Sequence, residues 1–151
     1  MISVVTINYN NSDGLEKTLA SVKAQNNLEA FEHVIIDGGS TDNSLSIANN
    51  YVKYNDNVIF QSERDKGVYD AMNKGLKLAT GEFVAFLNSG DTFTSRTCLS
   101  LITKKLMEEP ETDFLYGDIS IINDNGKRLR HWKSGSFSKF KLYFGWIPPH
   151  P

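Results

Sequence analysis

The chain opens with the stretch ISVVTINYN, which runs from Ile2 to Asn10. Its apolar and β-branched first part, residues 2–7, is typical of a strand that is covered on both faces. Polar residues follow it directly. The same order recurs at residues 34–36, 58–60 and 83–87, where short apolar runs again end in polar residues. We therefore predict that the opening stretch is the first strand of a mainly parallel sheet.

Helical patterns separate these runs. Apolar residues three and four positions apart predict four helices, marked in turn by Leu15, Leu19 and Val22, by Leu45, Ala48 and Val52, by Val68, Met72, Leu76 and Ala79, and by Leu99, Ile102 and Leu106. Asp13 and Glu16 have the spacing of a capping box at the start of the first helix. Strands that alternate with such helices form βαβ units, so we predict an α/β fold with helices flanking the sheet.

The pattern changes after Gly117. An aromatic run at residues 114–116 predicts a fifth strand, and the runs at 119–122 and 128–132 flank an Asp-Asn-Gly turn at residues 124–126. Asn-Gly favours a tight turn, so these two runs predict a small late β-hairpin. Because no linker or internal repeat marks a boundary, we predict one domain over residues 1–151.

Composition excludes several classes of protein. The chain has 151 residues, a formal net charge of -2 and one cysteine, so it has neither a basic nucleic-acid-binding face nor an internal disulfide. No apolar run approaches the ~20 residues of a membrane span, and the N-terminal run lacks the features of a signal peptide. We expect a soluble cytoplasmic domain with no nucleic-acid partner.

Polar residues gather where the predicted strands end, at residues 8–10, 37–40, 63–66 and 88–91. In open α/β sheets, ligands bind beyond the carboxyl ends of the strands. Carboxylates, cations, an aromatic ring and glycines along one edge suit a ligand with a base, a sugar and phosphates. The alternative is that these are ordinary turn residues, because turns need Gly, Asp, Asn and Ser.

Other nucleotide and metal signatures are missing. The sequence contains no G-x-G-x-x-G after the first strand, no G-x-x-x-x-G-K-[ST], and neither HExxH nor a Cys/His cluster with zinc spacing. A dinucleotide-dependent dehydrogenase, a P-loop NTPase and a zinc enzyme are therefore all disfavoured.

Several motifs in order resemble those of family 2 glycosyltransferases. They are the opening ISVVTINYN, VIIDGGSTD from Val34 and GEFVAFLNSGD from Gly81. The resemblance implies the GT-A fold. The segment SERDKGVYDAMNKG, which starts at Ser62, resembles a branch that builds bacterial exopolysaccharides and related surface glycans.

The resemblance implies a site for a nucleotide-diphosphate sugar, linked to UDP or GDP. Thr6 and Tyr9 match positions that line the nucleobase pocket, with the tyrosine ring against the base. Asp37 matches the first acid of the family's Asp-Asp pair. The second acid, which often contacts the base in relatives, is Gly38 in this chain. This departure leaves the identity of the base open.

Further donor contacts are implied by the loops and by the third helix. Arg64 and Lys66, on either side of Asp65, lie where cations could pair with a diphosphate. Asn73 matches an amide near the donor, and Ser89 belongs to the motif after the fourth strand. A solvated charge run and a helix-surface asparagine are the plain alternatives for the loop and for Asn73.

The resemblance also implies a divalent metal ion, Mn or Mg. Asp91 matches the last acid of the family's Asp-x-Asp-Asp pattern, while Asn88 and Gly90 replace two other acids. A hard cation draws further oxygen ligands from phosphates and water, so one carboxylate can suffice. His150 follows Pro-Pro in a segment like the family's acceptor side, where it could approach the metal. A turn aspartate and a surface histidine are the alternatives.

In this family the acceptor hydroxyl attacks the anomeric carbon opposite the leaving diphosphate and inverts it, with a carboxylate as base. The resemblance places that base beyond Pro151, so we expect a chain truncated at its C-terminus that binds donor and metal. No motif assigns the role to Asp118 or Asp124. The resemblance implies a glycan or a lipid-linked acceptor. A lipid-linked acceptor would draw the protein to the inner face of the membrane.

Two other functions stay open. A sugar nucleotidyltransferase would need a Gly-rich, basic loop after the first strand, and residues 10–14 contain no Lys or Arg. A non-catalytic nucleotide-sugar-binding domain would fit the loss of acids at Asn88 and Gly90.

Overall fold

A computed structural model describes residues 1–26, 31–123 and 125–148 of the chain. The chain divides into two compact units, Met1–Pro110 and Glu111–Pro151. The single domain over residues 1–151 stays a prediction.

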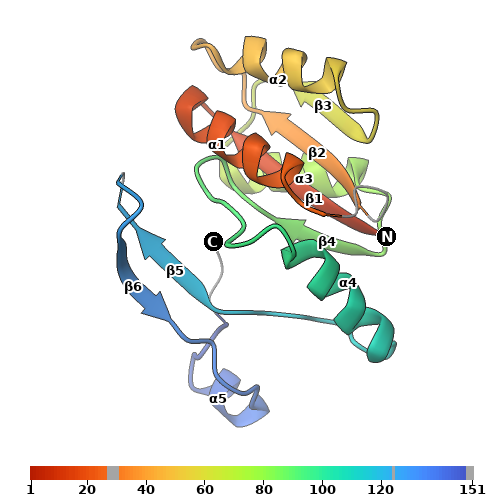
Figure 1. The fold of residues 1–151 in the computed structure, drawn as a ribbon, viewed down its shortest axis with the longest axis vertical. Helices are drawn as coiled ribbons and strands as arrows, with labels where there is room; N and C mark the ends of the chain where they lie inside the picture. The colour runs from red at the N-terminus through yellow and green to blue at the C-terminus, as the bar shows by residue number, and fades with distance from the viewer. Residues whose placement is uncertain (27–30, 124, 149–151) are drawn as a thin grey trace. The chain divides into compact units, whose positions relative to one another are not determined.

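The first unit is built on a four-stranded sheet (Figure 1). Its strands are β1 (Ile2–Asn8), β2 (Phe31–Asp37), β3 (Val58–Ser62) and β4 (Phe83–Phe86), in the order β3-β2-β1-β4. All three neighbouring pairs are parallel. Every residue of β1 and β2 is buried, as expected for the two central strands of a sheet covered on both faces. Their polar side chains pair across the two strands: the Ser3 hydroxyl donates to Glu32, and the Asn8 amide donates to Asp37. The predicted parallel sheet is confirmed.

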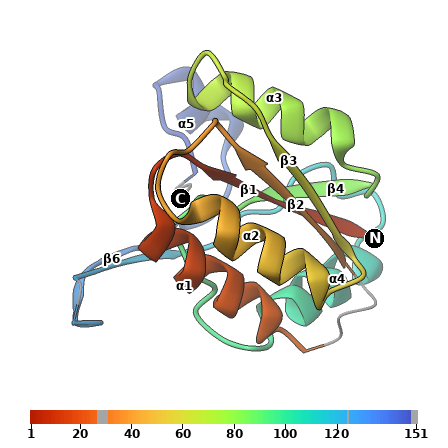
Figure 2. The same cartoon turned by 90° about the horizontal axis from the view of Figure 1, so that it is seen from above.

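Helices cover both faces of this sheet. They are α1 (Ser12–Lys23), α2 (Ser44–Lys53), α3 (Val68–Leu78) and α4 (Cys98–Glu108). Figure 2 shows α3 on one face and α1 and α2 on the other. On the α3 side, Val5 and Ile36 pack with Ala71. On the opposite side, Ile35 packs with Leu15 and Ala48. The sheet is thus the middle layer of an α/β/α sandwich, as alternating side chains along each strand require.

The buried face of α3 differs from the predicted stripe. Val68 and Leu76 are 50% and 46% exposed, whereas Ala71 and Gly75 are buried. A Cβ on Gly75 would collide with the Val5 side chain, so the glycine allows α3 to approach β1 closely. The prediction was wrong for Val68 and Leu76, whereas Met72 does pack against this core.

The start of α1 also differs from its prediction. The helix is capped by Asn11, whose side chain accepts a hydrogen bond from the backbone N–H of Gly14 at 3.2 Å. Asp13 already lies in the first turn. The capping box predicted at Asp13 and Glu16 is therefore wrong.

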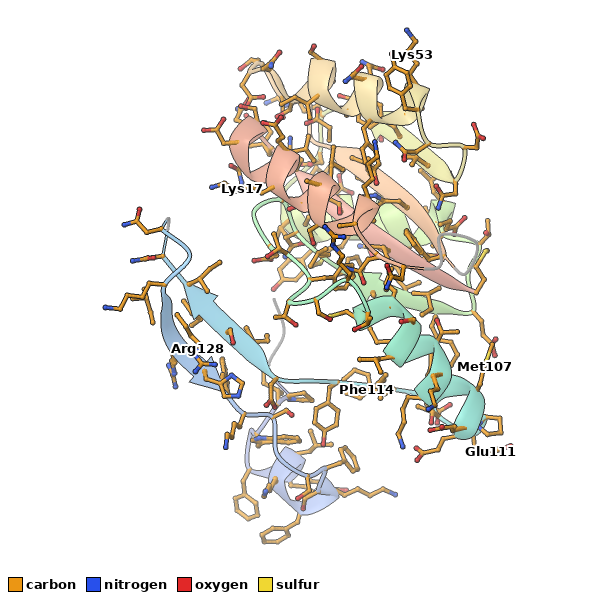
Figure 3. The ribbon with its side chains drawn as sticks, in the orientation of Figure 1. Lys17, Lys53, Met107, Glu111, Phe114 and Arg128 are labelled. Atoms are coloured by element: carbon orange, nitrogen blue, oxygen red, sulfur yellow. The ribbon has the colours of Figure 1, made fainter. Side chains whose placement is uncertain are left out.

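The second unit contains β5 (Ile119–Ile122), β6 (Arg128–Trp132) and the short helix α5 (Lys139–Tyr143). The two strands pair antiparallel, which confirms the predicted hairpin, and Gly126 between them has a φ of 74°. Residues 114–116 form no strand, so that prediction was wrong. Phe114 is 62% exposed (Figure 3), and its ring stacks on Tyr116 without a neighbouring strand. Across the ranges that the structure describes, no helix is both long and apolar enough to cross a membrane.

Candidate functional site

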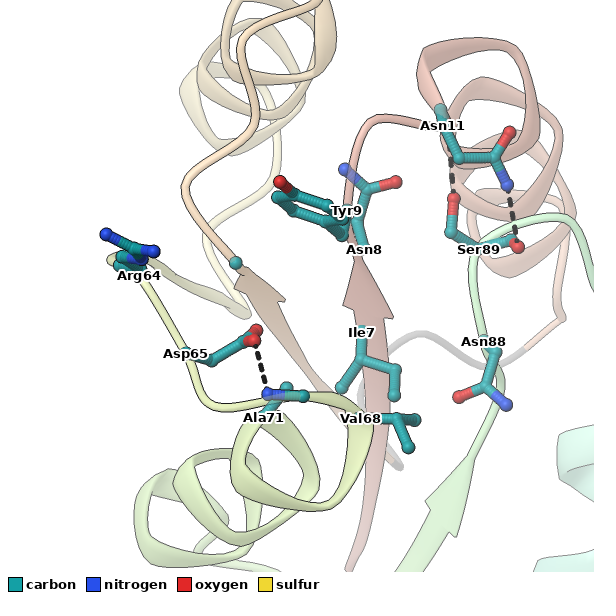
Figure 4. A pocket seen from close by; sticks show the side chains of 12 residues that line it. Ile7, Asn8, Tyr9, Asn11, Arg64, Asp65, Val68, Ala71, Asn88 and Ser89 are labelled. Carbon is teal, nitrogen blue, oxygen red and sulfur yellow. Dashed lines mark hydrogen bonds between the residues drawn. The ribbon is translucent and has the colours of Figure 1, made fainter.

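A cavity of about 610 Å³ lies where the four parallel strands end (Figure 4). All four strands contribute to its wall through residues at or after their carboxyl ends. Asn8 and Tyr9 come from β1, Gly38 follows β2, Asp65 follows β3, and residues 88–89 follow β4. The predicted clustering of polar residues at this edge of the sheet is therefore seen in one cavity, at the place where open α/β sheets bind ligands.

Tyr9 supplies an exposed aromatic ring on this wall. Its side chain is 65% exposed although it directly follows a fully buried strand. The next residue, Asn10, has a φ of 48°, which turns the chain sharply away from the sheet. The side chain of Asn10 accepts a hydrogen bond from the backbone of Thr41 at 2.8 Å. This turn leaves one ring free to stack against a planar ligand.

Asp37 is a buried hydrogen-bond centre behind the wall. Its carboxylate accepts hydrogen bonds from the side chains of Asn8, Ser40 and Ser62 and from the backbone N–H groups of Gly39 and Ser40. Burial alone would raise the pKa of Asp37, but these hydrogen bonds hold it below its usual value. The side chain therefore shapes the turn after β2 and is already saturated with partners.

The loop after β3 places charge beside the cavity. Arg64 and Asp65 line it, and Arg64 is exposed. Lys74 of α3 holds the loop, because its ammonium lies 2.9 Å from Glu63 and donates to the Arg64 carbonyl at 3.0 Å. The hydrogen bond and the charge of Glu63 raise the pKa of Lys74. The backbone that carries the Arg64 guanidinium is thus held in place by Lys74.

The turn after β4 is tied to α1. The Gly90 backbone N–H donates to the Thr18 hydroxyl at 2.9 Å, and that hydroxyl lies 2.8 Å from the Asp91 carbonyl. Asn11 donates to the Ser89 carbonyl at 3.0 Å (Figure 4). The amide oxygen of Asn88 is buried and has no hydrogen-bond partner in the described part of the chain. A buried acceptor left free on a cavity wall is costly unless a ligand or water satisfies it.

Asp91 is a half-buried carboxylate at the end of this turn. No hydrogen bond or ion pair reaches its carboxylate oxygens from any residue that the structure describes, and burial raises its pKa. Such a group gains from a bound cation, which would offset the cost of burying the charge. No cluster of three or more potential metal ligands exists among residues 1–26, 31–123 and 125–148. The donor set therefore fits an ion that takes most of its ligands from a substrate and water.

The predicted site residues fall into three groups. Tyr9, Arg64 and Ser89 line the cavity. Asp37 and Asp91 do not line the cavity, but each lies within two residues of one that does, Gly38 and Ser89 respectively. Thr6, Lys66, Asn73 and His150 form the third group.

Thr6 is fully buried, and its hydroxyl lies 2.9 Å from Nε2 of the buried His33. Lys66 and Asn73 are exposed and do not line the cavity. His150 lies outside the described residues. The cavity thus brings together the loop residues of the prediction but not the strand and helix residues.

Sequence reasoning missed part of the wall. Asn11, Gly67, Val68 and Ala71 also line the cavity. Val68 was predicted as part of the buried face of a helix, and its half-exposed side chain in fact faces the cavity. Gly67 and Val68 could have been identified from their place in the sequence, since they directly follow the polar cluster at residues 63–66, at the start of the third helix.

The chain matches known glycosyltransferases in sequence. The model of the family described as "Glycosyl transferase family 2" matches residues 3–150. A PGL/p-HBAD biosynthesis glycosyltransferase of Mycobacterium bovis is 34% identical over 145 residues, which cover 95% of this chain and 54% of that protein. An uncharacterised glycosyltransferase of Mycobacterium tuberculosis is 36% identical over 116 residues, or 77% of this chain and 44% of that protein. The chain thus spans about half the length of these relatives.

Solved structures agree on the fold. S. aureus TarS 1-349 in complex with UDP-GlcNAc has a TM-score of 0.66 and 28% identity, covering 72% of this chain and 32% of that chain. The mannosyltransferase PcManGT from Pyrobaculum calidifontis, in complex with GDP-Man and Mn2+, has a TM-score of 0.65 and 24% identity, covering 80% of this chain and 35% of PcManGT. These neighbours confirm the predicted GT-A fold. With the family match over nearly its whole length, the chain belongs to glycosyl transferase family 2.

Proposed function

We propose that the cavity at the strand ends binds a nucleotide-diphosphate sugar, and that this chain is the donor-binding part of a glycosyltransferase. The observation that carries the proposal is the composition of the cavity wall. It combines an exposed aromatic ring, a cation and unsatisfied amide oxygens beyond the carboxyl ends of four parallel strands. TarS, a relative of known structure, was crystallised with UDP-GlcNAc.

The wall residues have distinct roles in this proposal. The ring of Tyr9 stacks on the nucleobase. Arg64 pairs with the diphosphate, and Lys66 in the same loop adds positive charge. Asn8 and Asn88 also line the cavity, and their buried amide oxygens have no hydrogen-bond partner in the described part of the chain. Asp37, predicted as a donor contact, stays a proposed residue of the site, and its hydrogen bonds hold the turn that carries Gly38.

Asp91 holds a divalent ion, Mn or Mg, in the proposed complex. Its free, half-buried carboxylate supports this role. When bound, the ion would neutralise charge on the leaving diphosphate. His150 is proposed as a second contact on the acceptor side. Asn73 and Ser89 stay proposed donor contacts, with Ser89 the better placed because it lines the cavity.

For the whole protein, we propose inverting transfer of the sugar to a glycan or a lipid-linked acceptor in surface polysaccharide synthesis. The mycobacterial relative acts in PGL/p-HBAD biosynthesis by its name. The base that deprotonates the acceptor hydroxyl is proposed to lie beyond Pro151. A lipid-linked acceptor would bring the protein to the inner face of the membrane.

Isothermal titration calorimetry tests the donor site. UDP and GDP are titrated into the chain with Mn, and again with a chelator in its place. We expect saturable binding of at least one nucleotide that weakens when the metal is removed. Failure of both nucleotides to bind in the presence of Mn would show that the cavity is not a donor site.

A further inference from the structure

The space beside Gly38 is filled by another residue's side chain. A Cβ placed on Gly38 would collide with Oδ2 of Asp65 and would come within 3.2 Å of Cδ2 of Tyr9. Residue 38 follows β2 and residue 65 follows β3, so the two strand-end loops meet at this point. The Asp65 carboxylate therefore stands where a side chain at position 38 would stand, next to the aromatic ring.

Asp65 is held in this position with one oxygen left free. Its Oδ1 accepts a hydrogen bond from the Gly67 backbone N–H at 2.9 Å. Its Oδ2 accepts none from any residue in the described ranges. Figure 4 shows the side chain reaching from the β3–α3 loop toward β1 and β2, on the same side of the cavity as Tyr9. The half-buried carboxylate thus offers an acceptor to whatever lies against the ring.

A carboxylate accepts hydrogen bonds and cannot donate them. Uracil and guanine carry a hydrogen on the ring nitrogen of their pairing edge, N3 of uracil and N1 of guanine. Cytosine and adenine carry a lone pair on the corresponding nitrogen, which repels a carboxylate. An acceptor fixed beside the stacking ring therefore separates the two kinds of base, since a mismatched buried polar edge loses its hydrogen bond.

We propose that Asp65 determines base specificity: its free oxygen accepts the ring N–H of a base stacked on Tyr9, which selects uracil or guanine nucleotides. This inference rests on the proposed donor site and identifies the side chain that recognises the nucleobase of the bound donor. Asp65 takes the place that Gly38 leaves empty, so the acid of the site comes from β3 and not from β2.

Calorimetry with four nucleotides tests this role. UDP, GDP, CDP and ADP are titrated with Mn into the wild-type chain and into Asp65→Asn. We expect the wild type to bind UDP or GDP at least ~10-fold tighter than CDP and ADP, because one hydrogen bond to a charged group contributes a difference in affinity of about this size. The asparagine keeps an acceptor for the Gly67 N–H and adds a donor, so this ratio should shrink toward one.

Two further variants extend the test: one is a control for the loss of charge, and the other displaces the Asp65 carboxylate without removing it. Asp56→Asn removes the same charge from an exposed residue before β3, at the other edge of the sheet, and should leave the ratio unchanged. Gly38→Ala keeps Asp65 but pushes its carboxylate aside. It needs no positive φ, so the backbone tolerates it, and it should also shrink the ratio.

The outcomes separate the two proposals. Absence of binding by any nucleotide overturns the donor site and the role of Asp65 together. If nucleotides bind but the wild type shows no preference, or if Asp65→Asn and Gly38→Ala keep the wild-type preference, the donor site stands and the role of Asp65 is wrong.

Discussion

The turns after β2 and β4 both carry an aspartate, and the two carboxylates lie in opposite surroundings. Asp37 is 1% exposed and accepts five hydrogen bonds. Asp91 is half-buried and accepts none from the residues that the structure describes. Hydrogen bonds lower the pKa of the first against the effect of burial, whereas burial raises the pKa of the second. One acid builds the rim of the cavity, and the other is available to a ligand.

The largest expected effect is the loss of stability in Asp37→Ala. Removing this acceptor leaves the buried donors of Asn8, Ser40 and Ser62 without their partner, which should cost about 3–4 kcal/mol in the free energy of unfolding. Urea denaturation measures the change. Asp91→Ala is the matched control and should cost far less. Equal losses in the two variants would contradict the contrast between the turns.

The β1–β2 side should also show acid sensitivity through His33. This buried ring lies 2.9 Å from the Thr6 hydroxyl and 3.3 Å from the Tyr51 hydroxyl, and burial lowers its pKa from 6.5 to about 3. Below pH 6.5 the unfolded chain binds a proton that the folded chain excludes. Stability contributed by the neutral ring is therefore lost as the pH falls from 6.5 toward 3, by about 2 kcal/mol at pH 5 relative to pH 7.

His33→Gln removes that titration while keeping a polar side chain. Urea midpoints of this variant should change less between pH 7 and pH 5 than those of the wild type, although its stability at pH 7 is lower. Asp37 loses its stabilising charge only below its usual pKa of 3.8, outside this window. A wild-type slope in the variant would mean that another group causes the acid sensitivity.

A smaller effect concerns Asn11, which joins the start of α1 to the turn after β4. Asn11→Ala removes the cap of α1 and should cost about 1 kcal/mol. Asn11→Asp keeps the acceptor for the Gly14 N–H but loses the donor to the Ser89 carbonyl. We expect the aspartate variant to lose less stability than the alanine variant in urea denaturation. Equal losses would show that the contact with Ser89 matters more than the cap.

The sequence predicted the first unit well because its signals are local. Runs such as residues 2–7 have the residue pattern of a strand by themselves, and pairing with neighbouring strands stabilises the same conformation. The polar residues after each run predicted the edge of the sheet at which the cavity lies. Tyr9, Arg64 and Ser89 were found in this way, and all three line the cavity.

The remaining features depend on contacts between distant residues. Thr6 matched a base-pocket position, yet its side chain faces His33 inside the sheet layer. Residues 114–116 have the composition of a strand but pair with no strand in the part of the chain that the structure describes. The approach of Gly75 to Val5, and of Asp65 to Gly38, joins segments far apart in the chain. No local pattern reports such contacts.

The central claim is that the free carboxylate of Asp91 binds the divalent ion that accompanies the nucleotide. Calorimetry of UDP and GDP with Mn, on the wild type and on Asp91→Asn, tests it most directly. At neutral pH the raised pKa of Asp91 means that its charge is unfavourable in the folded state, so the variant should be as stable as the wild type or more stable. Its Mn-dependent affinity should fall at least ~10-fold. Unchanged Mn-dependent binding in Asp91→Asn would contradict the account.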